Sequence, residues 1–399
     1  MLVLEHSEKP GGKILISGGG RCNFTNIHTA PDRFFSANPH FCKSALSRYT
    51  PRDFLALVEK HQIAWHEKTL GQLFCDVSAK LILAMLLDEC AAAGVEVRVG
   101  QRVRTTLPLP LREGEGGRGC QAQTPEGLHP SPHPPPATGG GEYAVPPRFQ
   151  IETDAGTIQA ESIVLATGGL SIPKMGATGL SHDIARQFGL ALTETRPGLV
   201  PLTLPAGVLA RTQALSGVAL EVVARIGRKS FREALLFTHR GLSGPAILQI
   251  SSVWRPGDVL TIDLLPDLGP DFLIARKRAR PKASLRTLLH EALPQRAADL
   301  FAPEAIAARP MADIQDKALL ALGASLKAWQ VTPSGTEGYA KAEVTLGGID
   351  TDGLSSRTME AKSVPGLFVI GEAMDVTGWL GGYNFQWAWA SGHSAGLTA

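Results

Sequence analysis

The most constraining stretch of the sequence lies near the C-terminus, where an apolar run is followed by a glycine-rich segment and a helical pattern. The run reads VPGLFVI over residues 364–370, a Pro-Gly turn and then residues that favour a buried strand. Gly371 and Glu372 end this strand, and a helix is expected over residues 385–392. Strand, glycine loop and helix N-terminus in this order bring backbone N–H groups to an anionic or electron-rich ligand. An ordinary capped strand-to-helix turn explains the pattern equally well.

Particular groups in this stretch are suited to a ligand. Gly381 and Gly382 have no Cβ, so the backbone can approach a bound molecule closely there. The carboxylates of Glu372 and Asp375, at the strand end, can accept hydrogen bonds from ligand hydroxyl groups.

A second glycine-rich stretch near the N-terminus carries a dense set of hydrogen-bond donors. Residues 9–26 read KPGGKILISGGGRCNFTN, which has too few apolar positions for a core and predicts a loop with one short extended piece. Lys13, Arg21 and Asn23 are donors suited to phosphate or to flavin carbonyl oxygens. We therefore favour a binding loop over a solvated glycine loop.

Composition narrows the class of protein. At about 150 residues per domain, 399 residues predict two or three domains. The net charge is +2, and the one basic run, residues 276–282, is more typical of a solvated helix or loop, so neither a nucleic-acid partner nor a membrane is expected. No apolar segment reaches about 18 residues and no signal peptide is evident, which predicts a cytoplasmic protein.

The cysteines argue against several kinds of site. Their number is odd and no Cys-x-x-Cys is present, which disfavours a disulfide framework, an iron–sulfur centre and a redox dithiol. No metal-ligand spacing appears either, so we expect no metal. The five positions are Cys22, Cys42, Cys75, Cys90 and Cys120.

The pattern of strands and helices predicts a split domain. Residues 1–192 and 339–399 would form an α/β nucleotide-binding domain, and residues 193–338 an inserted domain, β-rich over 193–265 and helical over 271–330. Residues 107–147 are dominated by proline and glycine, which predicts a disordered insertion between two strands of a hairpin.

The start of the chain bears on the same fold. Residues 1–5 already read as a strand with an acidic end, which in a dinucleotide-binding fold is the second strand. Such a fold has a first strand, a Gly-x-Gly-x-x-Gly turn and a helix before it. We expect the true start to lie upstream of Met1, with a degenerate gene product as the alternative.

Three separated motifs together resemble one family. Residues 11–26, residues 166–169 (ATGG) and residues 371–384 look like those of the bacterial NAD(P)/FAD-dependent oxidoreductases, which include aminoacetone-oxidase-like and bile-acid-reductase-like flavoproteins. The resemblance implies a Rossmann-like FAD-binding domain of the glutathione-reductase type, with the inserted domain over the isoalloxazine. It implies FAD as the cofactor and NAD(P)H as a candidate electron donor.

The resemblance also implies roles for individual residues. Glu5 would hold the adenosine ribose, Val103 would offer backbone atoms to adenine, Glu372 would bind the ribityl hydroxyls, and Tyr383 and Asn384 would lie at the pyrimidine end of the flavin. The full set implied for the cofactor is Glu5, Gly12, Lys13, Ser17, Gly18, Gly20, Arg21, Cys22, Asn23, Val103, Thr167, Gly168, Gly169, Gly371, Glu372, Asp375, Gly381, Gly382, Tyr383 and Asn384.

Catalytic residues are less clearly indicated. His239, in a Thr-His-Arg-Gly run, and Tyr383 are candidate proton donors, although His239 is at least as well explained by a capping or interdomain hydrogen bond. We expect an FAD-dependent oxidoreductase that acts on a small organic molecule. The alternative is a truncated or degenerate flavoprotein, or a non-enzymatic FAD-binding scaffold associated with RNA through residues 276–282. No oligomeric state is indicated.

Overall fold

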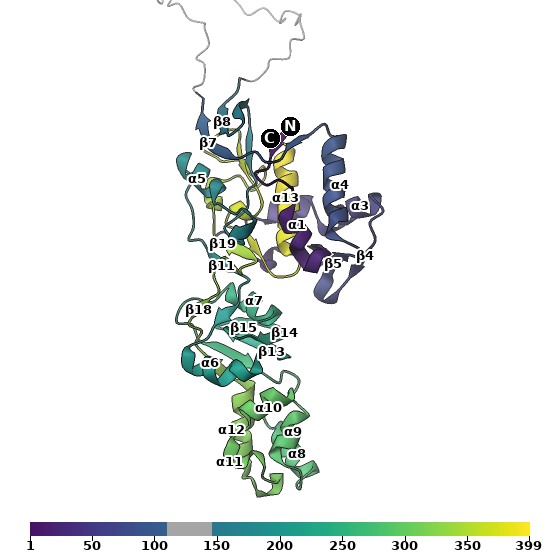
Figure 1. Cartoon of the computed structure of the whole chain (residues 1–399), viewed down its shortest axis with the longest axis vertical. Coiled ribbons are helices and arrows are strands. Elements are labelled where there is room, and N and C mark those ends of the chain that lie inside the picture. The colour runs from purple at the N-terminus through teal and green to yellow at the C-terminus, as the bar shows by residue number, and fades with distance from the viewer. Residues whose placement is uncertain (110–145) are drawn as a thin grey trace, which may run out of the picture.

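The computed structural model describes residues 1–109 and 146–399, and Figure 1 shows an elongated molecule. An upper body holds both ends of the chain, a β-sheet lies below it, and a helical lobe forms the lower end (Figure 1). Most of the proline- and glycine-rich segment predicted to be disordered, residues 107–147, lies outside the described residues. The strands on either side of it, β7 (Val103–Pro108) and β8 (Phe149–Thr153), pair antiparallel as a hairpin.

The upper body is built on two pairs of parallel strands. β1 (Leu2–Leu4) pairs with β6 (Glu96–Arg98), and β10 (Ile163–Leu165) pairs with β20 (Leu367–Val369). Each pair joins strands that are far apart in the sequence, so helices lie in the connections, as parallel pairing requires. The remaining strands of this body are β2 (Asn23–Asn26), β3 (Phe34–Phe35), β4 (Trp65–Glu67), β5 (Gln72–Cys75), β9 (Gly156–Ala160), β19 (Val344–Leu346) and β21 (Thr377–Gly378).

The helices of the upper body surround these strands. The longest, α4 and α13, each have 14 residues, and α13 carries the C-terminal glycine motif at its start. The helices are α1 (Gly12–Ile16), α2 (Lys43–Arg48), α3 (Pro51–Lys60), α4 (Ala79–Ala92), α5 (Leu180–Gln187) and α13 (Tyr383–Gly396). Trp387 of α13 is fully buried in the core formed with β20 and α2, which fixes the helix beside the parallel strands.

Below this body lies a seven-stranded sheet in the order β17-β16-β13-β14-β15-β12-β18. Its strands are β12 (Leu202–Thr203), β13 (Ala219–Ile226), β14 (Lys229–Phe237), β15 (Gly241–Ser243), β16 (Leu260–Asp263), β17 (Trp329–Val331) and β18 (Gly335–Thr336). The helices α6 (Ala206–Thr212) and α7 (Pro245–Ser251) accompany it. β11 (Arg196–Gly198) pairs antiparallel with β19 and so ties the start of this region to its return.

The helical lobe shares its core with the sheet. Buried leucines of the lobe, such as Leu273, Leu288 and Leu319, belong to the same apolar cluster as Val222 and Phe237 of the sheet. The lobe consists of α8 (Phe272–Ala279), α9 (Leu285–His290), α10 (Gln295–Phe301), α11 (Glu304–Ala307) and α12 (Asp316–Lys327). Sheet and lobe are therefore packed as one unit.

One local expectation is wrong. Residues 94–103 alternate in polarity, which predicts a single strand, but they form β6 and the start of β7, because Gly100 turns the chain at φ +65° between the two. Residues 9–26 contain one short strand, β2, as expected. They also contain the short helix α1, which begins after Gly11 in the left-handed conformation and after which Ser17 Oγ donates to the Ile14 carbonyl.

Candidate functional site

The start of α13 is held against β2 by very close backbone packing. Gly382 has φ +95°, and a Cβ built there would lie 2.5 Å from the Thr25 carbonyl oxygen. The Asn26 side chain donates to the Gly381 carbonyl at 2.8 Å. The glycines that suggested close approach to a ligand are thus required by packing within the chain; an additional ligand contact stays a prediction.

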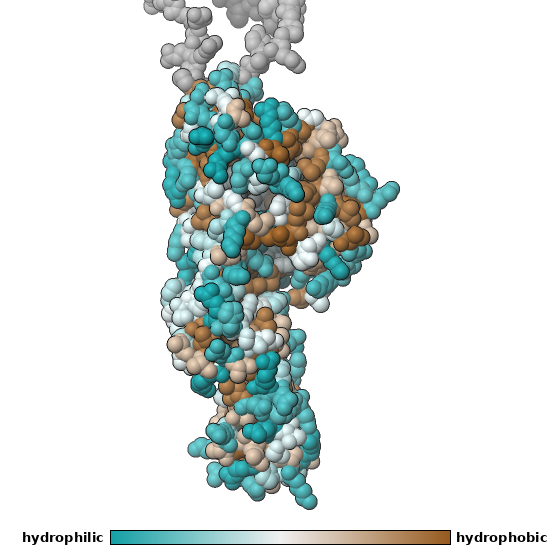
Figure 2. Space-filling model, in the orientation of Figure 1, coloured by the Kyte–Doolittle hydropathy of each residue, from teal (hydrophilic) through white to brown (hydrophobic). Residues whose placement is uncertain are grey.

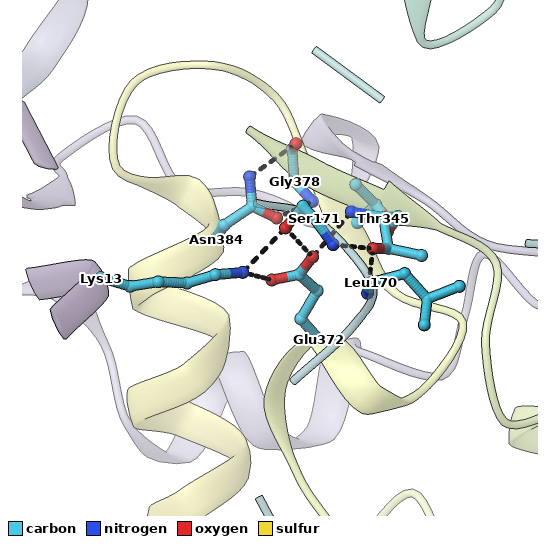
Figure 3. A network of polar contacts seen from close by, with 8 residues as sticks. Lys13, Leu170, Ser171, Thr345, Glu372, Gly378 and Asn384 are labelled. Atoms are coloured by element: carbon cyan, nitrogen blue, oxygen red, sulfur yellow. Dashed lines mark hydrogen bonds and ion pairs between the residues drawn. The ribbon is translucent and has the colours of Figure 1, made fainter. Parts of the chain in front are cut away.

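Two asparagines of the predicted site close the loop between β21 and α13. The Gly378 N–H donates to Asn384 Oδ1 at 2.8 Å, and Asn384 Nδ2 donates back to the Gly378 carbonyl at 2.9 Å (Figure 3). The Asn23 amide, in the orientation that satisfies its neighbours, accepts from Gly382 N–H at 3.2 Å and donates to the Leu73 carbonyl. Both side chains therefore shape the loop itself.

Glu372 is the centre of a polar network that joins four separate segments (Figure 3). Its Oε1 accepts from the backbone N–H of Thr345 at 2.7 Å and from Ser171 Oγ at 3.0 Å, and its Oε2 accepts from Lys13 Nζ at 2.9 Å. A Cβ on Gly169 would lie 2.4 Å from Thr345 Oγ1, so only glycine fits beside this network. Since an ionised carboxylate has about four acceptor positions, one remains for a ligand.

Sequence reasoning missed Ser171 and Thr345. Both residues are buried, and Thr345 Oγ1 accepts from the backbone N–H groups of Leu170 and Ser171. Their proximity to the glycine motifs was the one available signal, since Ser171 follows Gly169 by two residues and Thr345 precedes Gly347 by two.

Glycines at the ends of α1 and β10 face open space. Gly19 (φ +67°) and Gly168 (φ +72°) both have left-handed backbone, and a Cβ at either position would meet no heavy atom within 4 Å. Gly20 has φ +85°, and a Cβ there would meet only the Leu15 carbonyl oxygen, at 4.0 Å. Beside them, Thr167 is exposed and its hydroxyl lies 2.6 Å from Ser181 Oγ. An extended cofactor could run along these positions without a steric conflict, which fits an FAD-binding site.

The two residues predicted to bind the adenosine part of FAD, Glu5 and Val103, lie on segments that are joined by a backbone hydrogen bond. Glu5 follows β1, and its carboxylate accepts from the Ser7 N–H at 2.8 Å. The Gln101 N–H donates to the Glu5 carbonyl at 2.9 Å, two residues before Val103 at the start of β7. Arg21, at the other glycine loop, is exposed.

Asp375 makes its hydrogen bond outside the Glu372 network. It is buried, and its Oδ2 accepts from the Ala37 N–H at 2.8 Å. Burial raises the pKa of this carboxyl group above its usual value. Its role in the structure is to fix the segment after β3, and a cofactor contact stays a prediction.

The two candidate proton donors lie in different parts of the fold. Tyr383 is buried at the start of α13, with its ring edge-on to Phe34 and Trp379. Burial raises the pKa of its phenol further above neutral pH, where a tyrosine is already protonated. His239 is exposed in the turn between β14 and β15.

Trp379 joins the upper body to the sheet. The Arg33 guanidinium lies 4.5 Å from the centre of the Trp379 ring, and the Phe231 ring of β14 lies 4.9 Å from it. The Leu380 N–H donates to the Gln249 side chain of α7 at 3.0 Å. The loop that leads into α13 is therefore also the contact with β14 and α7.

Cys22 is buried in the backbone turn before β2, and burial raises the pKa of its thiol to about 11. The same effect raises the pKa of Cys42 to about 11. At pH 8 only about 0.1% of such thiols are ionised.

We therefore expect iodoacetamide to modify Cys22 and Cys42 of the folded protein about 100-fold more slowly than the same cysteines in urea. Peptide mass mapping measures each site, and the half-buried Cys90 serves as the internal control; rapid native labelling of Cys22 would contradict the assignment.

The parallel strand pairs β1–β6 and β10–β20, the second followed by glycine motifs, define a Rossmann-like α/β protein, the fold class expected from the sequence. The chain belongs to the family described as HI0933-like protein Rossmann domain, whose profile matches residues 1–110 and 142–398. This family of FAD-binding flavoenzymes confirms the expected class of enzyme.

Several named enzymes are similar to the chain along nearly its whole length. It is 48% identical to the "Ribosomal RNA dihydrouridine synthase" of Escherichia coli K12, over 98% of this chain and 90% of that protein. It is 42% identical to the protein of the same name from Haemophilus influenzae, over 99% and 91%. Identity to the "3-dehydro-bile acid delta(4,6)-reductase" of Clostridium scindens is 26%, over 100% and 92%.

These relatives correct one expectation. We expected no nucleic-acid partner, but the two relatives above 40% identity are named for ribosomal RNA, so that expectation is wrong. The net charge of +2 misled because it averages over the whole surface and says nothing of a local RNA site. In the part of the chain that the structure describes, no helix is long and apolar enough to cross a membrane, and no group of three or more metal-ligating side chains occurs.

Proposed function

We propose that this protein is an FAD-dependent enzyme that reduces a uridine of ribosomal RNA to dihydrouridine. The observation that carries the proposal is 48% identity to a ribosomal RNA dihydrouridine synthase over 98% of the chain. The bile-acid reductase relative, at 26% identity, is a weaker guide to the substrate. A cytoplasmic location is part of the proposal, because bacterial ribosomal RNA is made and assembled there.

The proposed reaction adds a hydride to one carbon and a proton to the other carbon of the uracil C5–C6 double bond. Bound FAD, in its reduced form, supplies the hydride, and we propose NAD(P)H as the source of its electrons. The protein must then hold the base and deliver the proton. We propose Tyr383 for the proton step, because its phenol is the proton-donating group at the start of α13, beside Trp379 of the loop that contacts the sheet.

We further propose that the cofactor lies along the glycine loops and the Glu372 network. The open positions at Gly19, Gly20 and Gly168 support this path, and the free acceptor position of Glu372 supports a contact with a ribityl hydroxyl. Residues 1–192 and 339–399 would form the FAD-binding domain. Residues 193–338 would form the substrate-facing domain, which the contact between Trp379 and Phe231 supports.

The test is restoration of the modification in living cells. Expression of this chain in an E. coli strain that lacks its own ribosomal RNA dihydrouridine synthase should return dihydrouridine to purified ribosomal RNA. Mass spectrometry of the nucleosides measures it, with an empty vector as control. Soluble, flavin-loaded protein without any dihydrouridine in the RNA would contradict the proposal. Reduction of a small steroid-like substrate instead would favour an activity like that of the bile-acid reductase relative.

A further inference from the structure

We propose that the tip of the β13–β14 hairpin, Arg225, Arg228 and Lys229, is the surface that holds the phosphates of ribosomal RNA next to the active site. The inference rests on the proposed function and adds to it the part of the protein that grips the substrate. An enzyme that acts on a base draws that nucleotide out of its stack, so it must hold the neighbouring backbone while the base enters the site.

The tip is a concentrated and unneutralised positive charge. Residues 225–230 read RIGRKS and contain no acidic residue. Arg225, Arg228 and Lys229 are exposed, and no described acidic side chain lies within ion-pair distance of them. Phosphate contacts through arginine and lysine supply most of the affinity of a protein for nucleic acid.

The next arginine along β14 shows that this feature is local. Arg232 donates to Glu221 at 2.7 Å and to both carboxylate oxygens of Asp267 at 2.8 and 2.9 Å. Its charge is therefore neutralised within the sheet, three residues from Lys229. Along the described β13–β14 hairpin, the basic side chains without an ion pair are therefore all at the tip.

The hairpin is placed beside the proposed active site. Ile226 pairs with Lys229, so the turn is formed by Gly227 and Arg228. Lys229 and Phe231 lie on the same face of β14 because side chains alternate along a strand, and the Phe231 ring contacts Trp379. Trp379 in turn lies against Tyr383, the proposed proton donor. Lys229 of the charged tip is therefore two residues along β14 from Phe231, the residue that contacts Trp379.

The shape of the molecule leaves room for RNA at this place. Figure 1 shows β13 and β14 below α1 and α13, and the part of the upper body that carries β4 and β5 projects farther out on the same side. Figure 2 shows that the outline steps inward beneath that overhang, which forms a recess on the same side. An RNA strand therefore has open space along the hairpin beneath this overhang.

The basic run over residues 276–282, the obvious RNA candidate in the sequence, is largely used inside the helical lobe. Arg276 donates to a backbone carbonyl at the end of α9. Lys277 Nζ lies 2.8 Å from Asp316, and Arg280 lies 2.6 Å from Glu291. These contacts fasten α8 to its neighbours, so we assign the RNA contact to the hairpin and not to this run.

The test compares two triple variants with the same loss of charge. One carries Arg225→Gln, Arg228→Gln and Lys229→Gln. The control carries Lys43→Gln, Arg52→Gln and Lys80→Gln, exposed positions on α2, α3 and at the start of α4. Binding of full-length protein to protein-free ribosomal RNA is measured between 50 and 300 mM NaCl.

The hairpin variant should bind about 10- to 100-fold more weakly, and the slope of log K against log salt should fall by about 2, as three lost contacts to single-stranded phosphates predict. The control should change affinity less than about threefold. Flavin content and melting temperature should match the parent in both variants.

The outcomes separate this inference from the proposed function. If the parent neither binds ribosomal RNA nor forms dihydrouridine, the proposed function fails. If the parent does both and the hairpin variant binds equally well, the hairpin assignment alone is overturned. Loss of binding to whole ribosomal subunits with unchanged binding to protein-free RNA would also overturn it, because the tip would then contact a ribosomal protein.

Discussion

Replacing Gly382 with alanine is expected to destabilise the folded protein by about 4 kcal/mol and to abolish flavin binding. Two effects add at this position. An alanine at φ +95° carries a backbone strain of about 1–3 kcal/mol. Its Cβ would also lie 2.5 Å from the carbonyl oxygen and 2.6 Å from the carbonyl carbon of Thr25, so β2 or α13 must move, at a cost of about 1–3 kcal/mol.

The control for this prediction lies in the same helix. A Cβ at Gly392 would meet only Ile370 Cδ1, at 3.8 Å, and its backbone is helical, so Gly392→Ala should be neutral or stabilise by up to about 1 kcal/mol. Urea denaturation measures both variants, and absorbance at 450 nm measures bound flavin. A Gly382→Ala protein as stable as the parent would show that the contact between β2 and α13 is not rigid.

Gly382 also illustrates what the sequence could and could not predict. The pattern around residues 364–392 predicted β20 and α13 correctly, because a buried strand and a helix each carry a strong local signal. The sequence indicated that the backbone at Gly381 and Gly382 is closely approached, but it did not show by which atoms. The crowding neighbours, Thr25 and Gln72, are more than 300 positions away in the chain.

The Glu372 network was also predicted only in part. The glycine motifs and Glu372 and Lys13 were each singled out from local pattern, and the structure brings Lys13 and Glu372 within 2.9 Å. Thr345 and Ser171 were missed, since a threonine inside a strand and a serine after a turn are common and carry no signal of their own. Their importance arises from the crossing of four segments.

Charge was the property that sequence reasoning handled least well. Arg280 and Arg228 look equally basic in the sequence, but Arg280 is paired with Glu291 whereas the described surroundings of Arg228 contain no such partner. Whether a basic residue is available to a ligand depends on acidic side chains that the fold brings near it. An RNA-binding surface of a few residues is therefore easily lost in a net charge of +2.

Glu372→Ala is expected to cost about 3 kcal/mol of stability and to weaken cofactor binding, whereas Glu372→Gln should cost about 1 kcal/mol. The carboxylate is 17% exposed, and its Oε1 accepts from the buried Thr345 N–H and Ser171 hydroxyl. Alanine leaves both donors unpaired, at about 1–3 kcal/mol each where no water replaces the acceptor. Glutamine can keep its carbonyl oxygen in the Oε1 position and loses only the Lys13 contact.

Lys13→Met separates the ion pair from the buried hydrogen bonds. Lys13 is 39% exposed, so solvent screens its ion pair with Glu372, and Lys13→Met leaves the Thr345 N–H and the Ser171 hydroxyl bonded to the carboxylate. This variant should therefore resemble Glu372→Gln in urea denaturation. Equal losses in Glu372→Gln and Glu372→Ala, with Lys13→Met close to both, would mean that the ion pair and not the buried donors stabilises the junction. The expected order is that Glu372→Ala alone is severely destabilised. That result would show that the Thr345 N–H and the Ser171 hydroxyl need an acceptor oxygen from residue 372.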